Sequence, residues 1–476
     1  MDIQCPICKK IIKSVHYVCS RHYNKVNVDS KGKFVLEDQA APEGADSIYC
    51  NKCYSAVPIE DVREKNKDSK GEVSCPRCDK KIDDPQYVDS KSPCKIEYLG
   101  ECTVEKHLLG KNTYSKPKNC EACKKEAGGD EDEDYSADCI YCENCQKPVP
   151  IVLTEDDVKV IPIGLVGVSQ SGKTCFKASL RRMLSDSPFY AAPQIKLPSS
   201  SFSYSPTEVI RKGRKLPART TFDGDMNLLP DYIAFSKNGQ KYVLIIYDMP
   251  GESMPKLDEH PKLKRDISIL KNVFILLDPT SSFEKFSIND DENTETSQVD
   301  IDTVYQCVLA FIGELNRHKK DCKVAFIVSK VDEENVLCEL KKANSEILSG
   351  LEIEREANKY GLFQQDEDGT PIEPDYGSEE YDFSKRLADD VVRRFIIDNE
   401  IDEESDRGGG RFTNIIDFKD KRNNIKEENV RYFAVSSIGI GAELDPETNV
   451  LNTKCKPFRV LDPIMWLIKE TDKENK

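Results

Sequence analysis

Short apolar runs alternate with helical patterns over the C-terminal two thirds of the chain. The apolar runs predict strands at 161–166, 232–235, 242–247, 273–277, 323–328 and 431–435. The segments between and after them predict helices at 172–185, 256–271, 302–318, 335–348, 382–399 and 462–469. Apolar strands separated by helices predict an α/β fold with a doubly wound, mostly parallel sheet.

The second and third predicted strands are an exception to this alternation. Only Ser236-Lys237-Asn238-Gly239 separates them, so they predict a hairpin. Polar inserts at 196–206, 281–300 and 364–380 interrupt the same region and predict loops.

Length and charge limit the class of protein. The chain has 476 residues, which predicts two or three domains. Its 69 Lys and Arg stand against 85 Asp and Glu, a formal charge of -16, which argues against general binding of duplex nucleic acid but leaves room for a local basic patch. The first residues lack the apolar segment of a secretory signal, and no apolar run approaches the ~20 residues of a membrane span. We therefore expect a cytoplasmic protein without a membrane span.

Cysteines are concentrated at the N-terminal end. Of the 19 cysteines, 14 lie within the first 145 residues. In a reducing compartment, clustered CxxC pairs indicate metal thiolates more often than disulfides. The predicted boundary separates a zinc-ribbon region at 1–156 from a nucleotide-binding domain at 157–476.

The cysteine-rich region contains an internal repeat. Its unit is CPxC, an insert, and then YCxxC followed by a VPI tail, and it occurs at about 1–62 and again at about 71–155. An offset of 70 residues also aligns Tyr17-Val18 with Tyr87-Val88.

The repeat predicts two zinc sites, since two CxxC turns can supply the four thiolates of a tetrahedral shell. A closed shell of this kind is structural and not catalytic. The four remaining cysteines of the second insert form an alternative third set, in which Cys139 or His107 could replace a member, whereas Cys19 has no expected role as a ligand. The first site is assigned to Cys5, Cys8, Cys50 and Cys53, the second to Cys75, Cys78, Cys142 and Cys145, and the third to Cys94, Cys102, Cys120 and Cys123.

A phosphate-binding pattern lies between the first predicted strand and the first predicted helix. The segment from Gly167 to Thr174 fits GxxxxGK[ST]. In this pattern small residues let backbone N–H groups surround phosphates, Lys173 neutralises phosphate charge, and Thr174 offers an oxygen to Mg²⁺. Nucleotide binding is therefore expected here.

Three further motifs each follow a predicted strand. They are a DxxG from Asp248 to Gly251, an SKxD from Ser329 to Asp332, and an SSIG that begins at Ser436. Because the carboxyl ends of parallel strands meet at one edge of a sheet, we expect all three to lie near the phosphate-binding loop.

This ordered set resembles the G1, G3, G4 and G5 elements of the Ras-like and translation-factor-related P-loop GTPases, the TRAFAC class, over about residues 160–440. The resemblance implies that Asp332 pairs with guanine N1 and N2, that the stem of Lys330 lies along the base, and that the loop of Ser436 and Ser437 meets guanine O6.

Two departures from that family pattern matter. Ser329 replaces the usual Asn or Thr, and Ser437 replaces the usual Ala. Glu252 stands where Ras-like members carry a water-orienting Gln, so slow or partner-activated hydrolysis is expected.

Two assignments complete the expected site. Thr221, with Thr220 beside it, is the expected switch I threonine, and Gln170 either helps to hold a potassium ion or is a polar loop residue. Magnesium is expected at Thr174, Thr221 and Asp248, and roles in hydrolysis at Gln170, Lys173, Thr221, Gly251 and Glu252. The residues expected to contact the nucleotide are Gly167, Ser169, Gln170, Ser171, Gly172, Lys173, Thr174, Cys175, Asp248, Gly251, Ser329, Lys330, Asp332, Ser436, Ser437 and Ile438.

A looser resemblance covers the whole chain. Zinc ribbons, a GTPase domain and the terminal segment 460–467 together are similar to GTPases of bacterial conflict systems, including those called double-GTPases. This implies a GTP-dependent switch that recruits protein partners through its ribbons. The alternatives are a zinc-ribbon GTPase associated with nucleic acid, suggested by the Lys-Lys pairs after each CPxC, and an ATP-binding P-loop NTPase.

Overall fold

The computed structural model divides the chain into two compact units. The first comprises 1–160, 187–205 and 229–245, and the second comprises 161–186, 206–228 and 246–476. The residues that the structure describes are 5–12, 16–18, 23–25, 47–50, 55–66, 81–82, 86–93, 105–106, 112–113, 139–142, 144, 147–155, 157–168, 171–186, 230–268, 270–283, 286, 301–318, 322–351, 362–363, 379–400, 425–439 and 456–474.

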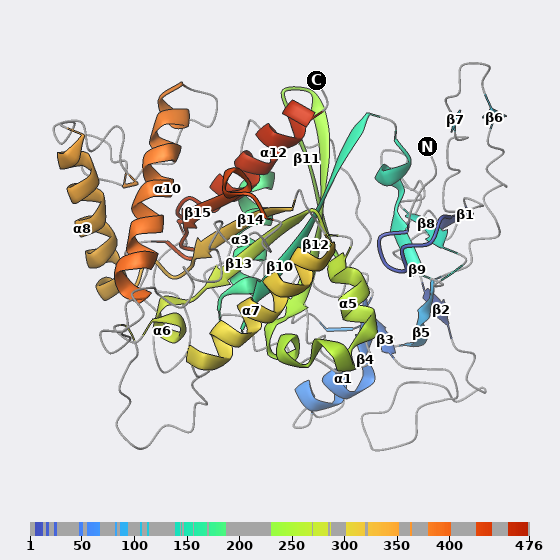
Figure 1. Cartoon of the computed structure of the whole chain (residues 1–476). Helices are drawn as coiled ribbons and strands as arrows, with labels where there is room; N and C mark the ends of the chain where they lie inside the picture. Colours follow the sequence, from blue (N-terminus) through green and yellow to red (C-terminus); the bar gives the residue numbers. More distant parts are fainter. Residues whose placement is uncertain are drawn as a thin grey trace. The chain divides into compact units, whose positions relative to one another are not determined.

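The fold is α/β, with a mostly parallel sheet of six strands in the order β11-β12-β10-β13-β14-β15 (Figure 1). The pairs β10–β13, β13–β14 and β14–β15 are parallel. All six predicted strands are confirmed, with ends that differ by at most four residues. Their bounds are β10 Val158–Gly167, β11 Asp231–Lys237, β12 Gln240–Pro250, β13 Asn272–Leu277, β14 Lys323–Val328 and β15 Val430–Ala434.

The predicted hairpin is also confirmed. Strands β11 and β12 are neighbours joined by Asn238 and Gly239, whose φ angles are 50° and 77°. Two successive positive φ angles are typical of a two-residue hairpin turn that Asn-Gly favours.

The centre of the sheet is apolar on both faces. Every residue of β13 and β14 is buried, as expected for parallel strands covered on two sides. Phe274 of β13 packs edge-to-face against Phe176 of helix α3, Lys173–Asp186, with ring centroids 6.3 Å apart. Burial of such runs is the main source of stability for this sheet.

Five of the six predicted helices are confirmed, and the helix over 256–271 is wrong as a single element. The chain there forms a 3-10 helix, η3, Gly251–Glu259, and then a separate helix, α5, Pro261–Ser268. Proline lacks a backbone N–H and favours the first position of a helix, so Pro261 begins a new one. The other helices are α6 Pro279–Ser282, α7 Ile301–His318, α8 Glu334–Gly350, α10 Glu379–Glu400 and α12 Asp462–Glu474, with a 3-10 turn, η6, at Glu427–Asn429.

The cysteine-rich segment forms smaller sheets, ordered β1-β8-β9, β2-β5-β3-β4 and β6-β7. The strand pairs of these sheets, among the residues that the structure describes, are antiparallel. The elements are β1 His16–Val18, β2 Tyr23–Lys25, β3 Ser47–Cys50, β4 Ser55–Pro58, α1 Ile59–Lys65, β5 Gln86–Pro93, β6 Glu105–Lys106, β7 Asn112–Thr113, β8 Cys139–Cys142, β9 Lys147–Pro150 and η1 Ile151–Thr154.

Among the described residues, no helix combines the length and the apolar character needed to cross a membrane.

Candidate nucleotide site and candidate metal centre

The loop between β10 and α3 makes a tight turn that requires glycine. Gly172 has φ of 87°, a conformation that L side chains rarely adopt. A Cβ on Gly167 would lie 2.5 Å from Ser171 Oγ and 3.1 Å from the carbonyl oxygen of Leu276. The two glycines of the pattern therefore allow this backbone path. Ser169 and Gln170 lie outside the described residues.

Lys173 lies against this loop. Its Nζ donates to the carbonyl oxygen of Val168 at 3.0 Å and to that of Gly167. Lys173, Thr174 and Cys175 are partly exposed. A partly exposed ammonium beside a glycine loop at a helix N-terminus is suited to an anion such as phosphate.

Ser329 connects this loop to the next two strands. Its hydroxyl lies 3.0 Å from the carbonyl oxygen of Ser171 and 3.2 Å from that of Leu277, the last residue of β13. The side chain is buried, and Ser329 directly follows β14. Ser329 therefore holds the loop between β10 and α3 to the end of the neighbouring strand.

Lys330 pairs with an acid that the sequence analysis missed. Its Nζ lies 2.6 Å from Oδ2 of Asp278, whose side chain is 3% exposed. Asp278 follows β13 and caps α6, because its Oδ1 accepts from the backbone N–H of Thr280 at 3.1 Å. The signal was present in the sequence, since Asp-Pro-Thr after an apolar run is typical of a helix start.

Asp332 and the SSIG loop are joined by Ser436. Burial raises the pKa of Asp332 above its ordinary value, and a hydrogen bond with Ser436 opposes that rise. Ser436 Oγ also accepts from the backbone N–H of Gly439 at 2.7 Å. Gly439 has φ of 107°, and a Cβ there would lie 2.1 Å from the carbonyl oxygen of Lys456. The buried Ser436 thus positions Asp332.

The other two residues of the SSIG loop have a different environment. Ser437 and Ile438 are partly exposed. The carbonyl oxygen of Ser437 accepts from the hydroxyl of Ser179, in α3, at 2.5 Å. Helix α3 is therefore bonded to the SSIG loop.

Asp248 lies near α3 and pairs with another missed residue. Its Oδ2 is 2.8 Å from Nζ of Lys177, and the two side chains are 26% and 7% exposed. Lys177 is the fourth residue after Lys173, so it lies one turn further along α3. The backbone of Gly251 and Glu252 begins η3. Thr220 and Thr221 lie outside the described residues.

The structure thus brings four predicted segments together around the carboxyl ends of parallel strands. Ser329 and Asp332, both of the SKxD segment, link it to Ser171 and to Ser436, and the pair of Asp248 with Lys177 joins the DxxG segment to α3. Such an edge is where open α/β sheets bind ligands.

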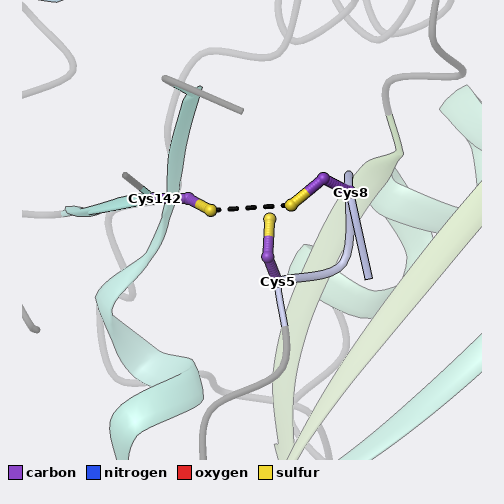
Figure 2. A group of neighbouring side chains, drawn as sticks. All are labelled: Cys5, Cys8 and Cys142. Carbon is purple, nitrogen blue, oxygen red and sulfur yellow. Dashed lines mark hydrogen bonds between the residues drawn. The ribbon is translucent and has the colours of Figure 1, made fainter. Parts of the chain in front are cut away.

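Three cysteine sulfurs also meet, in the first unit. The sulfurs of Cys5, Cys8 and Cys142 all lie within 4.8 Å of one another, and Sγ of Cys8 is 3.7 Å from Sγ of Cys142 (Figure 2). Zn–S bonds of about 2.3 Å in a tetrahedron place neighbouring sulfurs about 3.8 Å apart. The three side chains therefore fit three corners of a zinc site.

A tight turn and a strand position these sulfurs. The backbone N–H of Cys5 donates to the carbonyl oxygen of Lys10 at 2.9 Å, and that of Lys9 donates to the carbonyl oxygen of Cys5 at 2.8 Å. Cys142 ends β8, which pairs with β1. An apolar cluster of Ile7, Ile12, Ile140 and Val149 surrounds the buried Cys5 and Cys142.

This grouping corrects the predicted assignment of ligands. The repeat assigned Cys5 and Cys8 to one site and Cys142 to another, whereas the structure brings the three sulfurs together, since β1 of the first copy pairs with β8 of the second. Cys50 ends β3, and its side chain is not described. The alternative ligand His107 lies outside the described residues. So do eight predicted ligands, namely Cys53, Cys75, Cys78, Cys94, Cys102, Cys120, Cys123 and Cys145.

Comparison with known proteins assigns the chain to no group. No protein-family model matches it, and the search of curated proteins gave no match.

Proposed function

We propose that the protein is a GTP-binding switch with slow or partner-activated GTP hydrolysis, whose cysteine-rich region binds zinc and docks a protein partner. The observation that carries the proposal is the pair of hydroxyl links at the sheet edge. Ser329 bonds to the phosphate-binding loop, and Ser436 bonds to Asp332. These bonds hold segments that lie far apart in the sequence together as one site. A protein needs such a site to bind the phosphate and the base of one nucleotide.

Each group at this edge has a role in the proposal. Lys173 and the N–H groups of its loop bind phosphate oxygens. Thr174 and Asp248 offer oxygens to Mg²⁺, which neutralises phosphate charge when bound. Asp332 accepts from the guanine N1 and N2 groups. Lys330 is held by Asp278 at 2.6 Å, which orients its stem.

Turnover is expected to be slow in the isolated protein. A carboxylate at Glu252 can accept a proton from the attacking water, but it also repels the γ-phosphate. A partner protein that supplies a positive charge would offset this repulsion and accelerate the release of phosphate.

The decisive experiment measures the binding of fluorescent GTP and ATP analogues to three chains. The wild type is expected to prefer GTP, and Lys173→Ala is expected to bind both nucleotides about 100-fold more weakly, because an ammonium–phosphate contact is lost. Asp332→Ala is expected to lose the preference for GTP while it retains ATP binding. Asp390→Ala, which removes an exposed carboxylate of α10, is the matched control and should bind like the wild type.

Two results would contradict the proposal. Equal affinity for ATP and GTP, unchanged by Asp332→Ala, would indicate an ATP-binding protein. An absence of nucleotide binding in the folded wild type would refute the nucleotide site itself.

One observation weighs against the nucleic-acid alternative. Lys9, from the Lys-Lys pair that suggested it, donates from Nζ to the carbonyl oxygen of Pro6 at 2.5 Å, within its own turn. Retention on immobilised RNA or DNA that falls steeply with salt would favour that alternative over protein docking.

A further inference from the structure

Strands of one copy of the cysteine repeat pair with strands of the other copy. Strand β1, from the first copy, pairs with β8, from the second, and places Tyr17 opposite Ile140. Strand β5, from the second copy, pairs with β3, from the first, and places Tyr87 opposite Ile48. Neither β1 nor β5 pairs with the YCxxC strand of its own copy.

The two exchanged pairings have the same register. The repeat aligns β1 with the start of β5 and β3 with β8, so that Tyr17 corresponds to Tyr87 and Ile48 to Ile140. In each pairing the repeat tyrosine stands opposite the repeat isoleucine. The two pairings agree residue for residue. They therefore indicate two equivalent ribbons, each of which combines a strand of the first copy with a strand of the second.

The hairpin that follows each pairing repeats the same geometry. In β3–β4, Cys50 stands opposite Ser55, and in β8–β9, Cys142 stands opposite Lys147. Each of these cysteines is therefore the last residue of its strand and lies in the last residue pair before the hairpin turn. The first cysteine of each YCxxC motif occupies an equivalent position in its ribbon.

We infer that the two zinc sites are nested along the chain. The outer site joins the first CPxC to the last YCxxC. Its ligands are Cys5, Cys8 and Cys142, whose sulfurs meet in the structure, and Cys145 is the fourth by its motif. The inner site joins the second CPxC to the first YCxxC, and its ligands are Cys50, Cys53, Cys75 and Cys78. The inference rests on the zinc-binding part of the proposed function and is independent of nucleotide binding.

The chemistry of each site is ligand exchange without oxidation. One Zn²⁺ replaces the protons of four thiols, and these protons pass to the solvent. Cys8 and Cys142 are 134 residues apart, so the outer site closes a long loop around the inner one. Closing a long loop costs more chain entropy than closing a short one, which makes the outer site the weaker of two sites with equal ligands.

The nested arrangement can be tested by counting zinc ions in cysteine variants of the full chain. Cys8→Ser and Cys50→Ser are each expected to lose one zinc relative to wild type. Cys8→Ser combined with Cys142→Ser should also lose only one, whereas Cys8→Ser combined with Cys50→Ser should lose two. Sites formed within each copy predict the reverse for the two double variants. Cys338→Ser, at an exposed position of α8, should lose none.

A second measurement uses the wild type and so does not depend on the folding of a variant. Zinc is withdrawn stepwise with a chelator, and the alkylation of each thiol is followed by mass spectrometry. Nested sites predict that Cys5, Cys8, Cys142 and Cys145 lose protection together and before the inner four. Joint loss of Cys5, Cys8, Cys50 and Cys53 would overturn the inference. A wild type that holds no zinc would instead refute zinc binding as such.

Discussion

The parallel sheet and the cysteine-rich region are held together by different forces. In the sheet, β13 and β14 are buried along their whole length and consist largely of branched and aromatic side chains. In the cysteine-rich region, the cluster around the three sulfurs contains six buried residues, and Cys5 and Cys142 are two of them. Among the described residues this cluster buries little apolar area, which supports the proposal that zinc bound by the thiolates stabilises the region.

The two regions also differ in how distant residues meet. In the sheet, strand order brings the ends of β10, β13, β14 and β15 to one edge, and short side chains such as Ser329 then connect the loops. In the cysteine-rich region, the two copies exchange strands. The order of the parallel strands therefore forms the site at the sheet edge. In the cysteine-rich region, the pairing of strands between the two copies brings the cysteines together.

Removal of zinc should have the largest difference in effect on the stability of the two regions. A chelator is expected to unfold the cysteine-rich region, because structural zinc contributes about 10 kcal/mol or more to the folding of small thiolate domains. The sheet should keep its cooperative thermal transition. Limited proteolysis combined with calorimetry would detect this difference, and simultaneous loss of the sheet would show that the two regions do not fold independently.

A cavity beside the sheet should destabilise the sheet and leave the cysteine-rich region unchanged. Phe274 is 1% exposed, and Phe274→Ala is expected to lower the free energy of unfolding of the sheet by about 3–5 kcal/mol. Zinc content should not change, since no thiolate is involved. Leu309→Ala, at a side chain 39% exposed on α7, is the control and should cost less than about 1 kcal/mol. A loss of zinc in Phe274→Ala would contradict the comparison.

Asp389 should give the sheet a pH dependence of its own. Burial raises the pKa of this carboxyl to about 6, although its Oδ1 accepts from the backbone N–H of Tyr432 at 2.5 Å. Between its unfolded pKa of about 3.9 and 6, the folded chain holds the proton more tightly, so stability falls as pH rises through this window, by roughly 3 kcal/mol.

Substitution by the neutral amide isolates this effect. Asp389→Asn keeps an acceptor for Tyr432 and should lose that part of the slope, which denaturant unfolding of the sheet at about pH 4 and about pH 7 would measure. Asp398→Asn, at a side chain 52% exposed on the same helix, should retain the slope of the wild type. An unchanged slope in Asp389→Asn would refute the assignment of the titration to Asp389.

Local patterns were sufficient to predict most of the sheet. The apolar run 323–328 coincides with β14, and Asn238-Gly239 forms the predicted turn. Prediction failed where a local signal was overlooked, at Pro261, which begins a new helix. The same holds for Asp278, because Asp-Pro-Thr after an apolar run is typical of a helix start. Lys177 could not be predicted, because its partner Asp248 is 71 positions away and leaves no spacing to recognise.

The sequence by itself determined the strands, the phosphate-binding pattern and the residue type of every expected ligand, because each of these is encoded within a few neighbouring residues. Only the tertiary structure decided which cysteines share a site. Both CPxC turns are alike and both YCxxC strands are alike, so pairing within a copy and pairing between copies present the same local interactions. The pairing of β1 with β8 places Cys142 beside Cys5 and Cys8.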